Sequence, residues 1–171
     1  MGAVNAYKFH KFTYTIDFPV LFLFVGVSLD IVSTFLFVAL NAGSEAHPIL
    51  GQLISVSVWF IPVYLFMTNA FFVLFLSNVL RRTLSYAIGF SGILFSINNF
   101  SLVLFRNAFL VDTIGYTPLI IIFVLFGFIL FFYNIKVEKL NSRDIVNAFL
   151  QLFFYVIFIG IVNVLFFLIT L

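Results

Sequence analysis

The chain contains no cysteine, and only 8% of its 171 residues are Asp, Glu, Lys or Arg. The lack of cysteine excludes disulfide bonds, thiolate metal sites and thiol catalysis. Soluble domains carry about 25% charged residues, so this composition argues against a water-soluble fold. The longest basic run is the pair Arg81-Arg82, and we therefore predict no nucleic-acid partner.

Apolar residues make up the difference: 64% of the chain is hydrophobic, and phenylalanine alone accounts for 28 residues. A chain of this size exposes a large share of its surface, so lipid has to cover much of it. We interpret the phenylalanines as lipid-facing and inter-helix filler rather than as an aromatic cofactor site, and we predict no cofactor. The expected first partner is the lipid bilayer.

The hydropathy pattern predicts an all-α fold, an integral membrane bundle of five transmembrane helices. An interfacial segment, 1–17, precedes this five-helix domain, 18–171. We expect the second span to be kinked near Pro62 and to end at Arg81-Arg82. The predicted spans are 18–40, 53–80, 83–105, 118–135 and 145–171.

Basic residues predict the orientation of the bundle. If the N-terminus is cytoplasmic, seven of the eight Lys and Arg residues fall in inner segments, and Arg106 alone falls outside. This asymmetry is the one that the positive-inside rule describes, so we expect a cytoplasmic N-terminus and an outer C-terminus. The inner residues are Lys8, Lys11, Arg81, Arg82, Lys136, Lys139 and Arg143.

One acid, Asp30, interrupts the first span near its middle. An ionisable residue at that depth is costly, which makes it a functional hypothesis. Gly26, Ser33 and Thr34 share its helix face, so the stripe is expected to point into the bundle. Two interpretations stay open: a protonated Asp30 that hydrogen-bonds a neighbouring helix, or a proton relay, cation relay or substrate anchor.

The third predicted span carries a seam of small and polar residues at steps of four and three. Such spacing lets helices approach closely in lipid. At 1.5 Å per residue, Asp30 lies about 18 Å along its helix and 96–99 lies about 20–24 Å along the third. We therefore expect Asp30 to meet Ser96 or Asn99. The intramembrane cluster is Asp30, Ser33, Thr34, Ser96 and Asn99, and the packing seam is Ser85, Gly89 and Gly92.

Other polar residues lie within the second and fifth spans. They are expected to form inter-helix hydrogen bonds, worth about 0.6 kcal/mol each on average. They do not line up along a common face, so we do not predict a pathway from them. These residues are Asn69, Ser77, Asn78 and Asn163.

A second candidate cluster lies in the outer loops and contains Glu45, His47, Arg106 and Asp112. Carboxylate and imidazole both bind Zn²⁺, but two such ligands do not make a site, and no metal is predicted. We expect Glu45 to lie near the positive N-terminal end of the second helix. Arg106 or Asp112 is expected to pair with Glu45 or His47.

The stretch DIVST (30–34) followed by GSEAHP (43–48) resembles the signature of an uncharacterised family of small prokaryotic multi-pass membrane proteins. That signature has Asp-x-x-Thr-Thr on the first helix and then a Gly-x-x-Glu-x-Asn-Pro turn. Here Ser33 replaces the first Thr, His47 replaces the Asn, and Gly43 is one residue closer to the Glu. The resemblance covers about 30–50. It implies that Asp30, Thr34, Glu45 and Pro48 act as one unit in a prokaryotic plasma membrane, and it implies no activity.

Three functions are compatible with these patterns. The first, which we predict, is a non-enzymatic structural or accessory subunit that associates with itself or with other membrane chains, because no complete catalytic site is recognisable and the seams suit helix docking. The second is a proton- or ion-coupled transporter or channel element that uses Asp30. The third is an intramembrane enzyme built on Asp30, Glu45 and His47.

Overall fold

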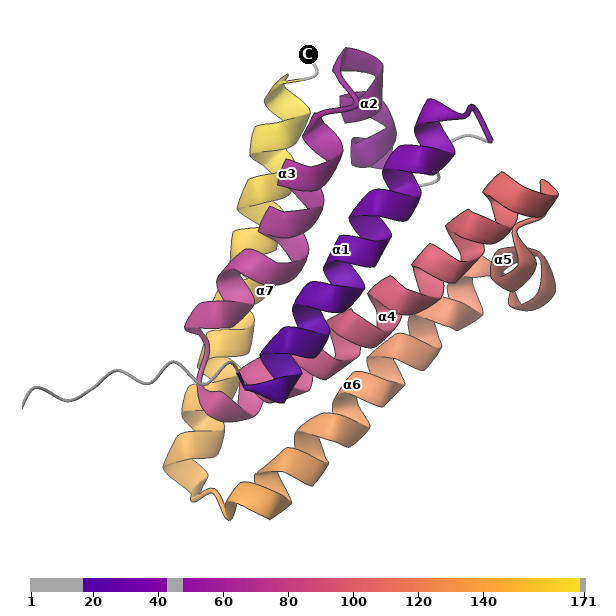
Figure 1. Ribbon diagram of the computed structural model, residues 1–171. Helices are drawn as coiled ribbons and strands as arrows, with labels where there is room; N and C mark the ends of the chain where they lie inside the picture. The colour runs from indigo at the N-terminus through magenta and orange to yellow at the C-terminus, as the bar shows by residue number, and fades with distance from the viewer. Residues whose placement is uncertain (1–16, 43–47, 170–171) are drawn as a thin grey trace, which may run out of the picture.

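The computed structural model describes residues 17–42 and 48–169. The described residues form helices and turns without any strand, which confirms the all-α prediction (Figure 1). In chain order the elements are α1 (Phe18–Ala39), α2 (Pro48–Val56), α3 (Phe60–Phe66), the π-helix η1 (Met67–Phe71), the 3₁₀-helix η2 (Phe72–Phe75), α4 (Asn78–Phe105), α5 (Phe109–Ile114), α6 (Tyr116–Glu138) and α7 (Ser142–Ile169).

Four helices, α1, α4, α6 and α7, are long and apolar enough to cross a membrane, judged by length and composition. They correspond to the first, third, fourth and fifth predicted spans. The bounds differ most at α4, which begins at Asn78 rather than at 83. Arg81 and Arg82 therefore lie in the first turns of α4. The prediction that they end the preceding helix is wrong.

The second predicted span, 53–80, is not one kinked helix. The chain leaves α2 after Val56, turns through 57–59, and restarts as α3, η1 and η2 over Phe60–Phe75. Pro62 is the third residue of α3, a position where the backbone N–H has no intrahelical partner to lose. The proline is thus accommodated by a new helix start, and the predicted kink becomes a break just before it.

Hydrogen bonds from side chains support the irregular backbone of η1. The hydroxyl of Thr68 donates to the carbonyl of Tyr64 at 2.8 Å, and the hydroxyl of Tyr155 on α7 donates to the carbonyl of Thr68 at 3.3 Å. A π-helix is a local departure from the regular ladder and is frequent at functional sites. Here tertiary contacts hold that departure in place.

The helices α1 and α4 run parallel and in contact along the predicted small-residue seam (Figure 1). A methyl group built on Gly26 of α1 would lie 2.6 Å from the Cα atom of Gly89 on α4, and one on Gly92 would lie 2.5 Å from the carbonyl oxygen of Gly26. At the start of both helices, Arg82 contacts Asp17 at 3.5 Å. The two backbones therefore touch, and their registers are fixed relative to one another.

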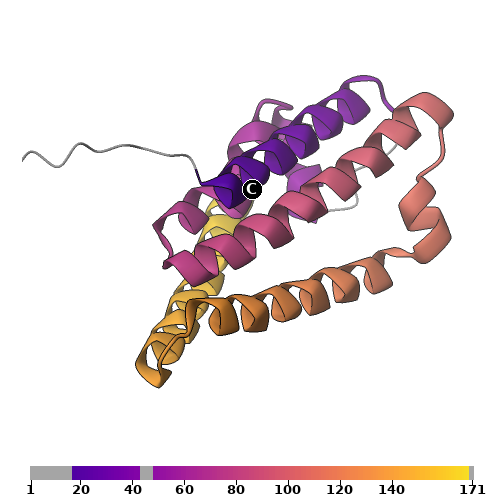
Figure 2. The same cartoon turned by 60° about the horizontal axis from the view of Figure 1, so that its bottom comes forward.

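Figure 2 shows α6 on the side of α4 away from α2, antiparallel to α4 and joined to it through α5. The amide of Asn134 donates to the hydroxyl of Thr83 at 3.0 Å, and Arg82 contacts Glu138 at 3.4 Å. On the other side, the hydroxyl of Tyr64 donates to Asn163 of α7 at 2.7 Å. Most of the outward apolar side chains on α6 and α7 are exposed.

Candidate functional site

The polar stripe of α1 meets α4 through Asn99. Its side-chain nitrogen donates to the hydroxyl oxygens of Thr34 at 3.0 Å and Ser33 at 3.2 Å. Ser33 in turn donates to the backbone carbonyl of Asp30 at 3.1 Å. Ser33 and Thr34 are buried, so these hydrogen bonds lie within the packed contact between the two helices.

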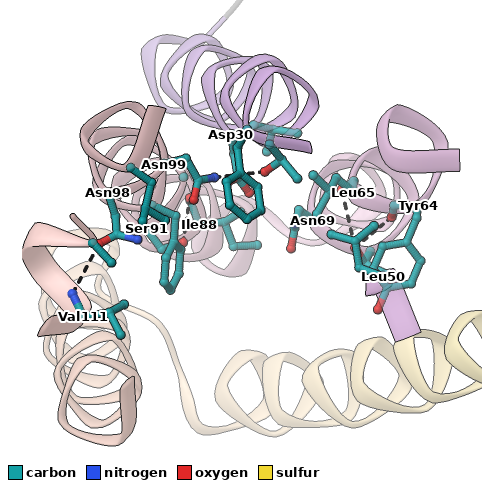
Figure 3. Close-up of a pocket in the computed structure, with 18 of the residues that line it drawn as sticks. Asp30, Leu50, Tyr64, Leu65, Asn69, Ile88, Ser91, Asn98, Asn99 and Val111 are labelled. Carbon is teal, nitrogen blue, oxygen red and sulfur yellow. Dashed lines mark hydrogen bonds between the residues drawn. The ribbon is translucent and has the colours of Figure 1, made fainter. Parts of the chain in front are cut away.

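Beside this contact is a cavity of about 530 Å³, bounded by α1, α4, α7 and the broken segment α3–η1 (Figure 3). We call it the Asp30 cavity. Its polar lining comprises one carboxyl group, four amides and four hydroxyls, and aliphatic and aromatic side chains cover much of the rest. The polar residues are Asp30, Thr34, Tyr64, Thr68, Asn69, Ser91, Asn98, Asn99 and Asn163.

The Asp30 cavity is closed at one end and extends toward the other. Its lining runs along α4 from Ile88 to Leu102, about 21 Å at the helical rise, and includes Leu50 of α2 and Val111 of the α5 segment. On the opposite side of Asp30, an apolar core closes the bundle. That core consists of Leu23, Val27, Ala70, Val73 and Tyr155. Asp30 therefore lies near the end of the cavity that borders this core, and the cavity extends from there toward α2 and α5.

The π-helix η1 supplies Asn69 to the cavity wall. Figure 3 shows this side chain on the cavity side of the broken segment, on the wall opposite Asn98 and Asn99. The Asn69 amide makes no hydrogen bond with any other described residue. The chain thus presents an amide with its oxygen and nitrogen both available, on the element whose backbone is least regular.

Asn98 holds the short helix α5 against the cavity. Its side-chain oxygen accepts hydrogen bonds from the backbone N–H groups of Leu110 and Val111, both at 3.2 Å. Ala108, the residue before α5, has no side-chain oxygen with which to cap the helix, so the side chain of Asn98 on α4 accepts from these N–H groups instead. Asp112 accepts a hydrogen bond from the N–H of Ala108 at 3.0 Å and completes the support.

The remaining residues of the predicted intramembrane cluster and seam all lie on α4. The hydroxyl of Ser96 donates to the carbonyl of Ile93 within α4. Of the two residues that we expect to meet Asp30, Asn99 is among the described residues that line the Asp30 cavity and Ser96 is not. Ser85 is fully buried, and its hydroxyl has no hydrogen-bond partner among the described residues. Gly89 and Gly92 lie at the contact with α1.

The outer-face cluster is described only in part, because Glu45 and His47 lie outside the described residues. Arg106 donates to the backbone carbonyl of Asn41 at 3.2 Å, just beyond the C-terminal end of α1, where a cation is favourable. Asp112 accepts a hydrogen bond from the N–H of Ala108. The expected pairing of Arg106 or Asp112 with Glu45 or His47 stays a prediction. Among the described residues, no three His, Asp or Glu side chains are grouped in a way that suits a metal ion.

The sequence patterns found Asp30, Thr34 and Asn99 but did not group Asn69 and Asn163 with them. The structure brings all five to one cavity, and Asn163 also makes an inter-helix hydrogen bond of the kind that we predict, with Tyr64. The available signal was that four of the five predicted spans each carry a polar residue in their interior. No family model, curated protein or solved structure matches the chain, so the chemistry of the site is argued from its own residues.

Proposed function

We propose that the chain is an integral membrane carrier that admits a small solute or ion to the Asp30 cavity. The observation that carries this proposal is the position of Asp30, midway along a helix of membrane-spanning length and on the wall of a cavity lined by both polar and apolar side chains. An acid in lipid is costly, and intramembrane acids usually face the bundle interior or a water-filled cavity on a substrate or ion path. This favours the second of the three functions over a purely structural one.

The asymmetry of the cavity supports a carrier. A carrier exposes its site to one side of the membrane at a time. The Asp30 cavity leads toward α2 and α5, whereas the apolar core around Val73 and Tyr155 separates Asp30 from the opposite end. This arrangement corresponds to one of the two states that alternating access requires.

The proposed topology has five crossings with a cytoplasmic N-terminus. The segment Phe60–Phe75 is shorter than the roughly 20 residues of a typical span, and α2 supplies the remaining length near the outer interface. Irregular backbone at membrane depth is tolerated where it faces protein or a cavity, as η1 does. Five of the six basic residues in the described part lie at the end where α1 and α4 begin, which supports the orientation.

An accessory subunit is the second candidate. The observation that favours it is the row of exposed apolar side chains along α6 and α7, including Phe128, Phe132, Phe153 and Phe154. Lipid covers such a surface equally well, so this row does not distinguish a partner from the bilayer. The enzyme hypothesis depends on Glu45 and His47 and stays a prediction.

The absence of cysteine allows a direct test with single-cysteine variants. Ser91→Cys places a thiol on the cavity wall, and Leu29→Cys places one on the outward face of α1 at nearly the depth of Asp30. Because only the thiolate reacts, a thiol in lipid stays inert to a charged, membrane-impermeant thiosulfonate reagent. We expect Ser91→Cys to react in membrane vesicles and Leu29→Cys to remain unlabelled.

The sidedness of labelling separates the two candidate functions. A carrier is expected to react at Ser91→Cys in right-side-out vesicles and, at a different rate, in inverted vesicles. Labelling from one side alone would favour a static pocket in an accessory subunit. If Ser91→Cys resists the reagent as completely as Leu29→Cys does, while the exposed Thr113→Cys reacts, then water does not reach the cavity and the carrier proposal is wrong.

A further inference from the structure

We infer that the Asp30 cavity binds a small neutral molecule with a carboxamide or urea group, and that this group lies between Asn69 and Asn98. The inference names the substrate class of the proposed carrier and rests on that proposal for access to the cavity. It is supported by the unused hydrogen-bonding capacity of the asparagines and by the size and apolar surface of the cavity. Recognition of this group does not use the charge of Asp30, which already interacts with a neighbouring group.

Asn98 presents to the cavity a donor that the protein does not use. This residue is only 6% exposed, and its side-chain oxygen accepts from the N–H groups of Leu110 and Val111, both at 3.2 Å. Its NH₂ group donates to none of the described residues, although Asn98 lines the cavity. A buried donor without an acceptor is costly, so an oxygen atom of a ligand in the cavity stabilises this group.

Asn69 presents a whole amide from the opposite wall (Figure 3). In the part of the chain that the structure describes, no residue hydrogen-bonds to its side-chain oxygen or nitrogen. An amide carries an acceptor and two donors, so a second amide can accept from it and donate to it at the same time. A carboxamide or urea on the ligand therefore uses both polar atoms of Asn69 at once.

Other side chains on the wall add both donors and acceptors. Asn163 on α7 accepts from Tyr64 with its oxygen, so its NH₂ group is a second donor. Asn99 donates toward α1 with its nitrogen, and the hydroxyl of Thr68 donates to a backbone carbonyl, so each keeps an oxygen as an acceptor. This mixture matches a ligand group that has a carbonyl oxygen and N–H groups.

The same atoms discriminate against charged ligands. An ammonium group only donates, so it would leave the NH₂ groups of Asn98 and Asn163 without an acceptor. A carboxylate only accepts, so it would leave the oxygens of Asn99 and Thr68 without a donor. A carboxylate would also meet no opposite charge, because no Lys, Arg or His is among the described residues that line the cavity. A neutral amide avoids both losses.

The volume and the apolar lining favour an amide with an apolar substituent. The cavity of about 530 Å³ lies within the range of small-molecule pockets, about 300–1,000 Å³. Phe37, Leu50 and Leu102 give it an apolar surface beside the asparagines. Small-molecule sites commonly combine such a surface with a few polar groups that fix the orientation of the ligand.

The test uses the full chain in membranes, the Ser91→Cys variant and four probes of nearly one shape. Benzamide carries the amide, acetophenone has a methyl group in place of its NH₂, and benzoate and benzylammonium carry a charge. Each probe is added before the thiosulfonate reagent, and the labelling rate is measured against probe concentration. We expect saturating benzamide to slow labelling at least about tenfold. The other three should need at least about tenfold higher concentrations for the same effect, because they leave buried polar groups unpaired.

Three variants in the Ser91→Cys background separate recognition from folding. Asn69→Leu removes the amide without breaking a hydrogen bond to any described residue, and Asn98→Asp replaces the NH₂ group but keeps an acceptor for α5. Each should raise the benzamide concentration that halves the labelling rate at least about tenfold. Asn147→Leu, at an exposed position of α7 outside the cavity lining, is the control and should leave that concentration unchanged. An equal rise in all three would show a general structural effect and overturn the assignment.

Each other outcome is decisive. If acetophenone, benzoate or benzylammonium protects as well as benzamide does, the carboxamide class is wrong. If Asn69→Leu or Asn98→Asp is protected as the parent is, the placement of the amide group between these two residues is wrong. If Ser91→Cys is labelled but benzamide does not slow the reaction, the ligand inference fails while the carrier proposal stands. If Ser91→Cys is never labelled, both fail.

Discussion

Gly26 of α1 and Gly89 of α4 are in direct backbone contact. A methyl group on Gly26 would lie 2.6 Å from the Cα atom of Gly89 and closer still to its carbonyl oxygen. Backbone atoms cannot rotate away, so this pair sets the distance between the two helices. That distance in turn allows Asn99 to reach Thr34 at 3.0 Å and places Asp30 against the cavity wall formed by α4.

We expect Gly26→Ala to destabilise the protein by about 1–3 kcal/mol, the usual cost of overpacking a close contact. The measurement is unfolding in detergent, followed by heat or denaturant. Gly160→Ala is the matched control, because a methyl group on Gly160 of α7 meets nothing within 4 Å. In a helix this control should be neutral or slightly stabilising. Equal destabilisation by both variants would contradict the close contact between α1 and α4.

The hydrogen bond between Asn99 and Thr34 should appear as a coupling energy. We expect a double-mutant cycle with Asn99→Ala and Thr34→Val to give about 0.6 kcal/mol, and at most about 1.7 kcal/mol, as for other hydrogen bonds between membrane helices. Ser33 shares the same donor, so the cycle measures only part of the contact. Thr83→Val, far along α4, should combine additively with Asn99→Ala. A coupling no larger than that of the distant pair would argue against the hydrogen bond.

The short helix α5 should depend on Asn98. Six residues are too few for a helix to be stable alone, and Asn98 supplies the acceptor for two of its N–H groups. Removing such a cap costs about 1 kcal/mol, so Asn98→Ala should raise amide exchange at Leu110 and Val111 about fivefold. Asn98→Asp keeps the acceptor oxygens and should preserve protection. Unchanged exchange in Asn98→Ala would mean that other contacts hold α5.

The sequence predicted best those helices that consist of one long apolar run with polar residues at both ends. The span 18–40 became α1, Phe18–Ala39, and the seam with Gly89 predicted the helix that packs against it. The broken segment was not predictable, because 57–59 is mostly apolar and Pro62 alone suggested a kink. The π-helix depends on a hydrogen bond from Tyr155, nearly ninety residues away along the chain.

The residues of the candidate site likewise fall into a part that the sequence predicted and a part that it did not. Asp30, Thr34 and Asn99 lie on regular helices, so their periodicity showed which faces meet. Asn69 lies in η1, where the π-helical turn and the break before α3 shift the phase of the helix. Periodicity therefore could not tell that Asn69 faces the same cavity as Asp30. The geometry of that wall follows from tertiary contacts rather than from local sequence.

The proposed fifth crossing predicts the depth of Trp59, the only tryptophan of the chain. Trp59 lies at the break before α3 and is 71% exposed. If α2 and Phe60–Phe75 together complete the crossing, this break lies at the outer interface, where tryptophan side chains are favoured. We expect lipids brominated near the headgroup to quench Trp59 fluorescence more strongly than lipids brominated near the chain ends.

A matched reporter fixes the scale of this measurement. Leu29→Trp in a Trp59→Phe background places the indole on the outward face of α1, about 17 Å from its start and so near the middle of the helix. Its fluorescence should be quenched most by bromine near the chain ends. If Trp59 gives the same deep profile, the break lies within the bilayer core. Irregular backbone exposed to lipid does not occur within the bilayer core, so the five-crossing topology would have to be abandoned.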